Sequence, residues 1–169
     1  MSDRKTVSEE DGMSEVTKHM LVRISRVNHN SAEPTDWPSL SEVKELVEEG
    51  ADVHAVHTQY SYTTLHYASE YEPPRCEEGL AIVKFLVSKG VDHTKKDFSG
   101  DLPIHLAAKF NNLPVLRYWI EEKDVNIEVT NYNGSTPLHF ASNHNSLDLM
   151  GYLVVCKNAN LLAKTKVCD

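Results

Sequence analysis

Apolar residues recur at intervals of three and four along several segments of the chain, which is the spacing of one face of an α-helix. In the N-terminal part this spacing predicts one helix from Glu15 to Asn28 and another from Leu40 to Glu49. The apolar stripes are Val16, Met20, Ile24 and Val27 in the first helix, and Leu40, Val43, Leu46 and Val47 in the second. Ser39 and Glu42 form a capping-box signature at the start of the second helix. A further apolar helix is predicted within Leu80–Asp92.

A seven-residue pattern recurs three times along the chain. It reads TTLHYAS at Thr63–Ser69, LPIHLAA at Leu102–Ala108 and TPLHFAS at Thr136–Ser142. Its histidines, His66, His105 and His139, lie 39 and 34 residues apart. A short turn also follows each apolar helix, at Gly50–Val53, Gly90–Asp92, Asp124–Asn126 and Asn158–Asn160. Glycine and asparagine tolerate the left-handed backbone that ends helices, so these turns mark four helix ends.

These motifs and turns closely resemble ankyrin repeats, whose period is about 33 residues. The resemblance implies an all-α fold, a solenoid of stacked helix pairs with projecting β-hairpin loops. It places repeats at 57–95, 96–129 and 130–169, after a degenerate repeat at 13–56 and a disordered tail at 1–12. The spacing of 39 then contains an insertion within Glu72–Gly79, whose two prolines cannot continue a helix.

The recurring histidines invite a metal or catalytic interpretation, but repeats stack about 10 Å apart, whereas zinc needs ligand nitrogens at about 2.0–2.1 Å. We therefore expect them to hold the repeats together. The short helices are expected to start at threonine or proline, namely at Thr63, Pro103, Thr136 and Pro137. A threonine hydroxyl can cap the free backbone groups of the first turn. Proline suits this position because the N–H that it lacks would have no partner in the helix. Leu102 stands where the family has threonine, which predicts a weaker helix start there. Asn111 and Asn145 replace the glycine that the family prefers after the first helix of a repeat.

Composition excludes several functions. The net charge of −8 and the lack of a basic patch oppose binding to nucleic acid or anionic membranes. No apolar run is long enough to span a bilayer, and the three cysteines, Cys76, Cys156 and Cys168, form no CxxC pair. We expect an intracellular, cytoplasmic protein with free thiols, in which Cys156 is a small buried hydrophobe. His54 and His57 lack the glutamate of a zinc-protease motif. No active site, cofactor or metal site is predicted.

In a repeat solenoid, the loop tips and the inner helix face bind the partner. By resemblance, the predicted partner-binding residues stand just before each motif or at the ends of the inner helices. They are Tyr60, Tyr62, Phe98, Asp101, Lys109, Phe110, Tyr132, Asn133 and His144. The four aromatic residues of the tips are expected to be accessible, because tyrosine and other large rings dominate interface hot spots. The leading hypothesis is a non-catalytic adaptor, inhibitor or effector that binds another protein, as a monomer rather than a dimer.

An alternative is a structural fragment or subunit of a larger assembly, docked through its apolar C-terminal repeat. Leu149, Leu153, Val154, Leu161 and Leu162 are expected to face outward there, although terminal repeats normally carry a polar cap. Short ankyrin proteins include viral proteins that resemble NF-kappa-B inhibitors, and effectors of intracellular bacteria. Membership of either subfamily would imply a location in the host-cell cytoplasm, and a nuclear location is the alternative to a cytoplasmic one.

Overall fold

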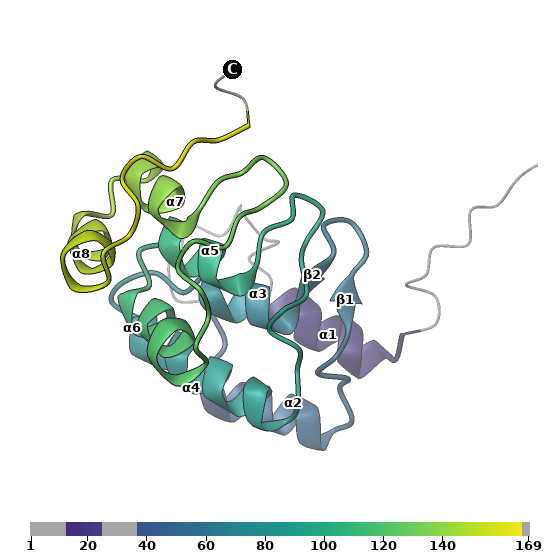
Figure 1. Ribbon diagram of the computed structural model, residues 1–169. Coiled ribbons are helices and arrows are strands. Elements are labelled where there is room, and N and C mark those ends of the chain that lie inside the picture. Colours follow the sequence, from purple (N-terminus) through teal and green to yellow (C-terminus); the bar gives the residue numbers. More distant parts are fainter. Residues whose placement is uncertain (1–12, 25–36, 167–169) are drawn as a thin grey trace, which may run out of the picture.

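The computed structural model describes residues 13–24 and 37–166, and these are mostly helical (Figure 1). The elements are α1 (Glu15–Ile24), α2 (Leu40–Glu48), β1 (Val56–His57), β2 (Tyr62–Thr63), α3 (Thr64–Ser69), α4 (Cys76–Ser88), α5 (Pro103–Lys109), α6 (Leu113–Arg117), the π-helical turn η2 (Tyr118–Glu122), α7 (Pro137–Asn143), α8 (Leu147–Gly151) and the π-helical turn η3 (Tyr152–Cys156). The predicted tail at 1–12 and the last residues of the predicted first helix lie outside the described residues.

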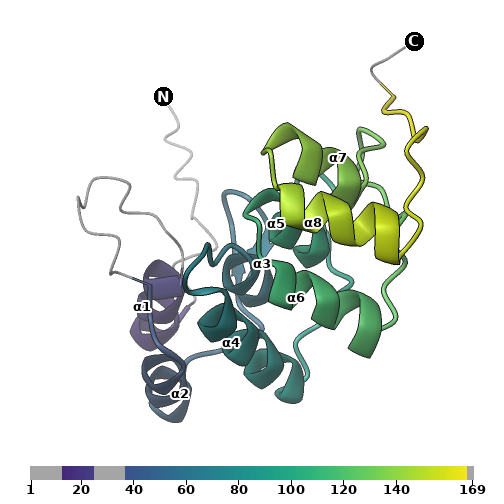
Figure 2. The same cartoon turned by 90° about the vertical axis from the view of Figure 1, so that its left-hand side faces the viewer.

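The helices form two rows. In the inner row α1, α3, α5 and α7 each contact the next helix of the row. In the outer row α2 contacts α4 and α4 contacts α6, while α8 lies beside α6 (Figures 1 and 2). The strands β1 and β2 pair antiparallel, with Val56 opposite Thr63, and the loops before α5 and α7 project on the same side as this hairpin. Within the described residues the predicted helices and their stacking are present, with one paired hairpin, β1-β2, and loops at the equivalent places before α5 and α7.

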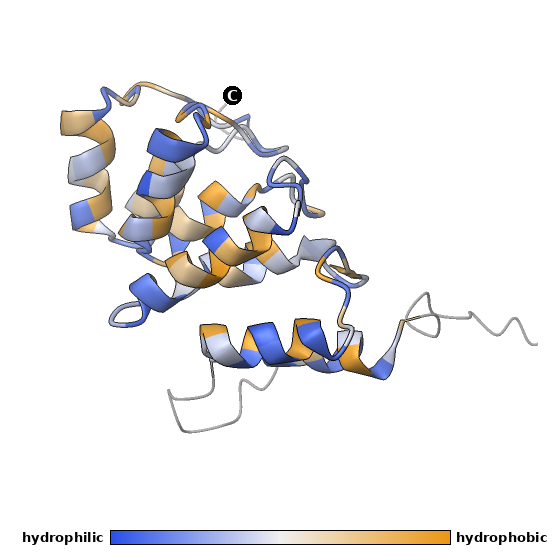
Figure 3. Cartoon of the chain, turned by 90° about the horizontal axis from the view of Figure 1, so that it is seen from below, coloured by the Kyte–Doolittle hydropathy of each residue, from blue (hydrophilic) through white to orange (hydrophobic). Residues whose placement is uncertain are grey.

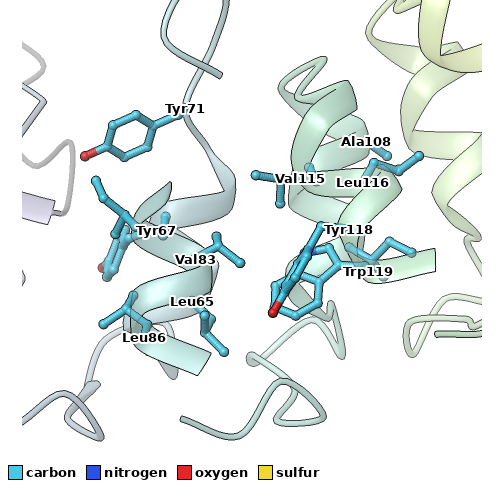
Figure 4. Packing of buried hydrophobic residues seen from close by; sticks show 14 of the residues in the cluster. Leu65, Tyr67, Tyr71, Val83, Leu86, Ala108, Val115, Leu116, Tyr118 and Trp119 are labelled. Atoms are coloured by element: carbon cyan, nitrogen blue, oxygen red, sulfur yellow. The ribbon is translucent and has the colours of Figure 1, made fainter. Parts of the chain in front are cut away.

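One hydrophobic core runs between the two rows, from Met20 in α1 to Ala159 after η3. Figure 4 shows its middle, where Leu65 and Tyr67 of α3 face Val83 and Leu86 of α4. In the outer helices the residues of one stripe fill this space, as the apolar spacing predicts, whereas α3 is buried throughout and α5 is buried except at Lys109.

Helix ends follow the predicted turn chemistry. The Ser39 hydroxyl accepts from the Glu42 N–H at 3.3 Å and the Glu42 carboxylate accepts from the Ser39 N–H at 2.7 Å, which confirms the capping box. The Glu42 carboxylate accepts from the backbone N–H and from the hydroxyl of Ser39, and these two bonds, the backbone one first, lower the pKa of Glu42. Left-handed backbone occurs at Gly50 and Gly90, as predicted. It also occurs, again as predicted, at Asn111, Asn145 and Asn158.

The 34-residue spacing has a structural origin in the outer helices. After α4 the Val91 N–H bonds to the carbonyl of Leu86, five residues earlier, whereas the Val125 N–H reaches back six residues to Trp119. The Ala159 N–H likewise reaches six residues back, to Leu153. The extra residue is absorbed in η2 and η3 as a π-helical turn, the usual form of a single insertion in a helix.

The insertion between α3 and α4 ties the first helix pair to the second. Tyr71 is fully buried, its hydroxyl donates to the carbonyl of Pro38 at 2.7 Å, and its ring lies 4.2 Å from that of Trp37. The Arg75 guanidinium donates to the carbonyl of Trp37 at 2.9 Å, and Glu78 accepts from the backbone N–H of Leu40. This segment therefore has a structural role that its sequence does not suggest.

Two expectations for the C-terminal repeat are wrong. Cys156 is exposed rather than buried, at the position that the exposed Glu122 has in η2. Leu149 and Leu153 are buried, because one side of the helix turns back onto the core. Leu161 and Leu162 are exposed, as expected, and Val154 is half-buried.

Candidate partner-binding surface

The motif histidines connect each repeat to the next. His66 Nδ1 accepts from the backbone N–H of Thr63 at 3.1 Å and lies 2.8 Å from the Thr63 hydroxyl, while its Nε2 lies 3.1 Å from the carbonyl of Asp101. His105 repeats this arrangement, because its Nδ1 accepts from the N–H of Leu102 at 3.0 Å and its Nε2 lies 3.2 Å from the carbonyl of Val129. A ring that accepts at Nδ1 must carry its proton at Nε2, so each Nε2 donates to the following repeat.

Burial keeps these rings neutral. His66 and His105 are fully buried, and desolvation lowers the pKa of both, that of His105 to about 4. His139 makes the same contacts to Thr136, at 3.2 Å from the N–H and 2.8 Å from the hydroxyl, but is only half-buried. Within the described residues its Nε2 has no carbonyl to bond. His66 and His105 therefore bond both within their own repeat and to the next one, and His139 bonds only within its own; that the histidines hold the repeats together stays a prediction.

Asp97 and Asn131 shape the two later hairpins. The Asp97 carboxylate accepts from the N–H groups of Ser99 and Asp101, both at 2.8 Å. The Asn131 amide oxygen accepts in the same way from the N–H groups of Asn133 and Ser135 in its own hairpin. The Asn131 amide nitrogen donates to the Asp101 carboxylate of the preceding hairpin at 2.9 Å. Burial raises the pKa of Asp101, and the neighbouring Asp97 adds to the shift.

Backbone bonds lock the hairpin tips together. The Phe98 N–H donates to the carbonyl of Tyr60 and the Tyr132 N–H to that of Ser99, both at 3.1 Å. The Lys166 N–H donates in turn to the carbonyl of Asn133 at 2.8 Å. The side chains of Tyr60, Phe98 and Tyr132 are 49%, 66% and 55% exposed. Three aromatic residues therefore stand in successive tips on a backbone that is fixed by hydrogen bonds.

Tyr132 is positioned by a glycine and a lysine that sequence reasoning missed. Gly100 has a φ of 79°, and a Cβ there would lie 2.6 Å from Tyr132 Cγ. The ring therefore rests on the glycine of the preceding hairpin, with Lys96 Nζ 5.3 Å from its centroid. The signal was available in part, because a glycine just before a motif marks a turn in which the backbone of the next repeat approaches closely.

Two of the predicted binding residues are not accessible in the expected way. Tyr62 is half-buried, with its ring 5.1 Å from that of Tyr67 and 5.3 Å from that of His66, so the prediction that it stands free is wrong. Asp101 is buried because it joins two hairpins. The other positions are open to a partner: Asn133 and His144 are exposed, while Lys109 and Phe110 are half-buried with Lys109 Nζ 5.2 Å from the Phe110 ring centroid.

The side chain of Leu102 is more buried than its position at the start of a helix predicts. It is half-buried and lines a pocket of about 230 Å³ together with Ile104, Trp119 and Val129. This contact offsets the missing hydroxyl in part, whereas the bond from the Leu102 N–H to His105 is one that Thr63 and Thr136 make as well.

Two features are absent from the described part of the chain. No group of three or more His, Cys, Asp or Glu side chains there is placed to hold a metal ion. No helix in the same residues is long and apolar enough to cross a membrane.

Comparison with known proteins names the family. A family model described as ankyrin repeats in three copies matches residues 75–165. The chain belongs to the ankyrin repeat family. A search of curated proteins found no match. The all-α repeat fold predicted from the motifs is thereby confirmed, and ankyrin repeats generally act as non-enzymatic modules that bind other proteins.

Proposed function

We propose that this ankyrin repeat protein is a non-catalytic intracellular adaptor, inhibitor or effector that binds one protein partner, as a monomer, through its hairpin tips and the concave face of its inner helices. The main observation behind this proposal is the row of exposed aromatic rings at Tyr60, Phe98 and Tyr132. Exposed aromatic residues gain little from the fold, whereas they contribute strongly to interfaces once a partner removes them from water.

The arrangement also favours binding energetically. The tip backbones are held by hydrogen bonds between hairpins, so a partner meets a surface that loses little conformational entropy on binding. Lys109, Phe110, Asn133 and His144 lie at the ends of the inner helices or in the last tip and extend this surface. Asp101 and Tyr62 lie beneath this surface and stabilise its hairpins, Asp101 through its bond to Asn131 and Tyr62 through its ring contacts.

The test replaces Tyr60, Phe98 and Tyr132 together by alanine. Because surface substitutions usually cost under about 0.5 kcal/mol each, the triple variant should lose no more than about 1.5 kcal/mol of unfolding free energy and should stay folded. Recovery of the partner in a quantitative pull-down with the intact chain should fall, and its affinity should drop about thirtyfold, the effect of losing one hot spot of about 2 kcal/mol.

The matched control is Glu77→Lys, on the exposed side of α4 and away from the tips. Glu78 is unsuitable because it accepts from Leu40. If the triple variant is folded and binds the partner with the affinity of the parent, the recognition surface lies elsewhere. If the triple variant unfolds, the three rings are needed for the fold.

A further inference from the structure

The pocket that Leu102 lines, of about 230 Å³, lies between the turn that follows α4 and the turn that follows η2. Its walls on the helix side are apolar and include Ile104 and Trp119, which belong to the core. Figure 3 shows hydrophobic residues, in orange, interspersed with hydrophilic ones along the helices. Its polar lining residues belong to the two turns, where Thr94 and Asp124 are exposed. The pocket therefore leads from two polar turns to side chains of the core.

The size and the walls of the pocket fit one aromatic ring. The His93 imidazole and the Trp119 indole, which both line it, lie nearly parallel, with planes 13° apart and centroids 5.6 Å apart. An apolar cavity of about 150 Å³ takes up benzene, so this pocket has room for one ring with a substituent. It is smaller than the sites of about 300–1,000 Å³ that hold whole small-molecule ligands. The volume therefore favours a single side chain as the occupant.

The indole N–H of Trp119 is a hydrogen-bond donor without an acceptor. Its Nε1 is buried and has no hydrogen-bond partner in the described part of the chain. Most buried donors in proteins are paired. The side chains of Ile104, Val125 and Val129, which form other walls of the pocket, carry no acceptor. We therefore expect the occupant to carry one itself.

The turns beside the pocket do not favour a charged occupant. They contribute one cation and one anion, Lys123 and Asp124, and the Lys123 Nζ lies 5.6 Å from the ring centroid of Tyr118. A charged side chain would lose its water on entering the apolar part without gaining an ionic partner there. Phenylalanine has the ring but no acceptor, and the indole of tryptophan only donates. Tyrosine combines one ring with a neutral hydroxyl that accepts.

We propose that this pocket binds a tyrosine side chain of the protein partner, whose hydroxyl accepts a hydrogen bond from the Trp119 indole N–H. The exposed tip residues Phe98 and Tyr132 belong to the two loops that continue from the turns beside the pocket, so a partner on these tips lies close to it. An aromatic anchor in a desolvated pocket is a common interface hot spot. The inference rests on the proposed function, because it takes the occupant from a protein.

Two probes that differ only in the hydroxyl test the chemistry on the full chain. N-acetyl-L-tyrosinamide and N-acetyl-L-phenylalaninamide are each titrated into isotopically labelled protein, and the indole N–H signals of its two tryptophans are followed by NMR spectroscopy. The tyrosine probe should shift the Trp119 signal saturably and downfield, as expected of a new hydrogen bond. Absence of a saturable shift would refute the inference, and equal shifts with both probes would refute the role of the hydroxyl.

Trp119→Phe keeps an aromatic wall and removes the N–H. The ratio of the two probe affinities separates the lost hydrogen bond from a change in shape, since both probes meet the same altered pocket. The preference for the tyrosine probe should fall about threefold to tenfold in this variant. An unchanged ratio would overturn the assignment of the hydrogen bond.

A second variant locates the site without touching the core. Thr94→Trp places a large ring at the exposed border of the pocket and should weaken the tyrosine probe at least about tenfold, with a melting temperature close to that of the parent. Lys95→Trp, at the next and likewise exposed residue, is the matched control and should bind the probe as the parent does. Equal affinity in the two variants would show that the probe binds elsewhere and would overturn the site.

The triple alanine variant of the tips separates this inference from the proposed function. It should keep the affinity of the parent for the tyrosine probe, because Tyr60, Phe98 and Tyr132 do not line the pocket. Failure of the probe to bind the parent therefore refutes the tyrosine pocket alone, whereas full partner affinity in the tip variant refutes the proposed tip surface alone.

Discussion

His105 should make the stability of the protein depend on pH in the mildly acidic range. The ring is fully buried, and its pKa falls from 6.5 to about 4 in the folded protein, mainly by desolvation. The unfolded chain therefore binds a proton at this histidine more readily than the folded chain does. Stability from His105 is present above pH 6.5 and is lost as the pH falls toward 4.

The magnitude follows from the two pKa values. With 6.5 for the unfolded and about 4 for the folded state, His105 costs about 2 kcal/mol of unfolding free energy between pH 7 and pH 5. His66 shifts in the same direction, so the protein as a whole should lose more. The variant His105→Gln removes the titrating group while retaining an acceptor for the Leu102 N–H.

Urea unfolding followed by circular dichroism at pH 7 and pH 5 measures the effect. The His105→Gln variant should be less stable than the parent at pH 7, because two hydrogen bonds are lost or weakened. Between pH 7 and pH 5 it should lose about 2 kcal/mol less than the parent. His144→Gln, at an exposed position, is the control and should follow the parent. If the parent and His105→Gln lost the same unfolding free energy between pH 7 and pH 5, the conclusion that His105 is buried, neutral and bonded to Val129 would be refuted.

The repeat fold could be predicted because its signals are local. Each short inner helix begins at a threonine, leucine or proline motif, and each outer helix ends at a residue that tolerates left-handed backbone, so three motifs and four turns fix the phase of the stack. The spacing of 34 exceeds the family period of about 33 by one residue, and the sequence alone does not show which part of the repeat contains the extra residue. Its accommodation as a π-helical turn depends on keeping Trp119 and Val125 in the core, which is a tertiary constraint.

The candidate surface could be predicted only in part, because exposure depends on side-chain contacts both within a repeat and between repeats. Tyr62 and Phe98 both stand upstream of a motif, yet Tyr62 packs on Tyr67 while Phe98 is exposed. Asp101 has the sequence position of an ordinary tip residue, and only the fold places the amide of Asn131, 30 residues later, beside it. Such pairings between repeats leave no periodic signal in one repeat.

Two further substitutions test the packing around the hairpins. Tyr62→Ala should lower the unfolding free energy by about 2 kcal/mol, since it removes ring contacts to both Tyr67 and His66, whereas Phe98→Ala should stay within about 0.5 kcal/mol of the parent. Gly100→Ala should cost more than Gly50→Ala in the same urea assay. Both glycines have positive φ, which costs an alanine about 1 kcal/mol, but a Cβ on Gly50 meets nothing within 4 Å while one on Gly100 would lie 2.7 Å from the backbone nitrogen of Tyr132. Because that nitrogen is held by the Ser99 carbonyl, the hairpins must separate to make room, so equal losses in the two variants would contradict the interlocked tips.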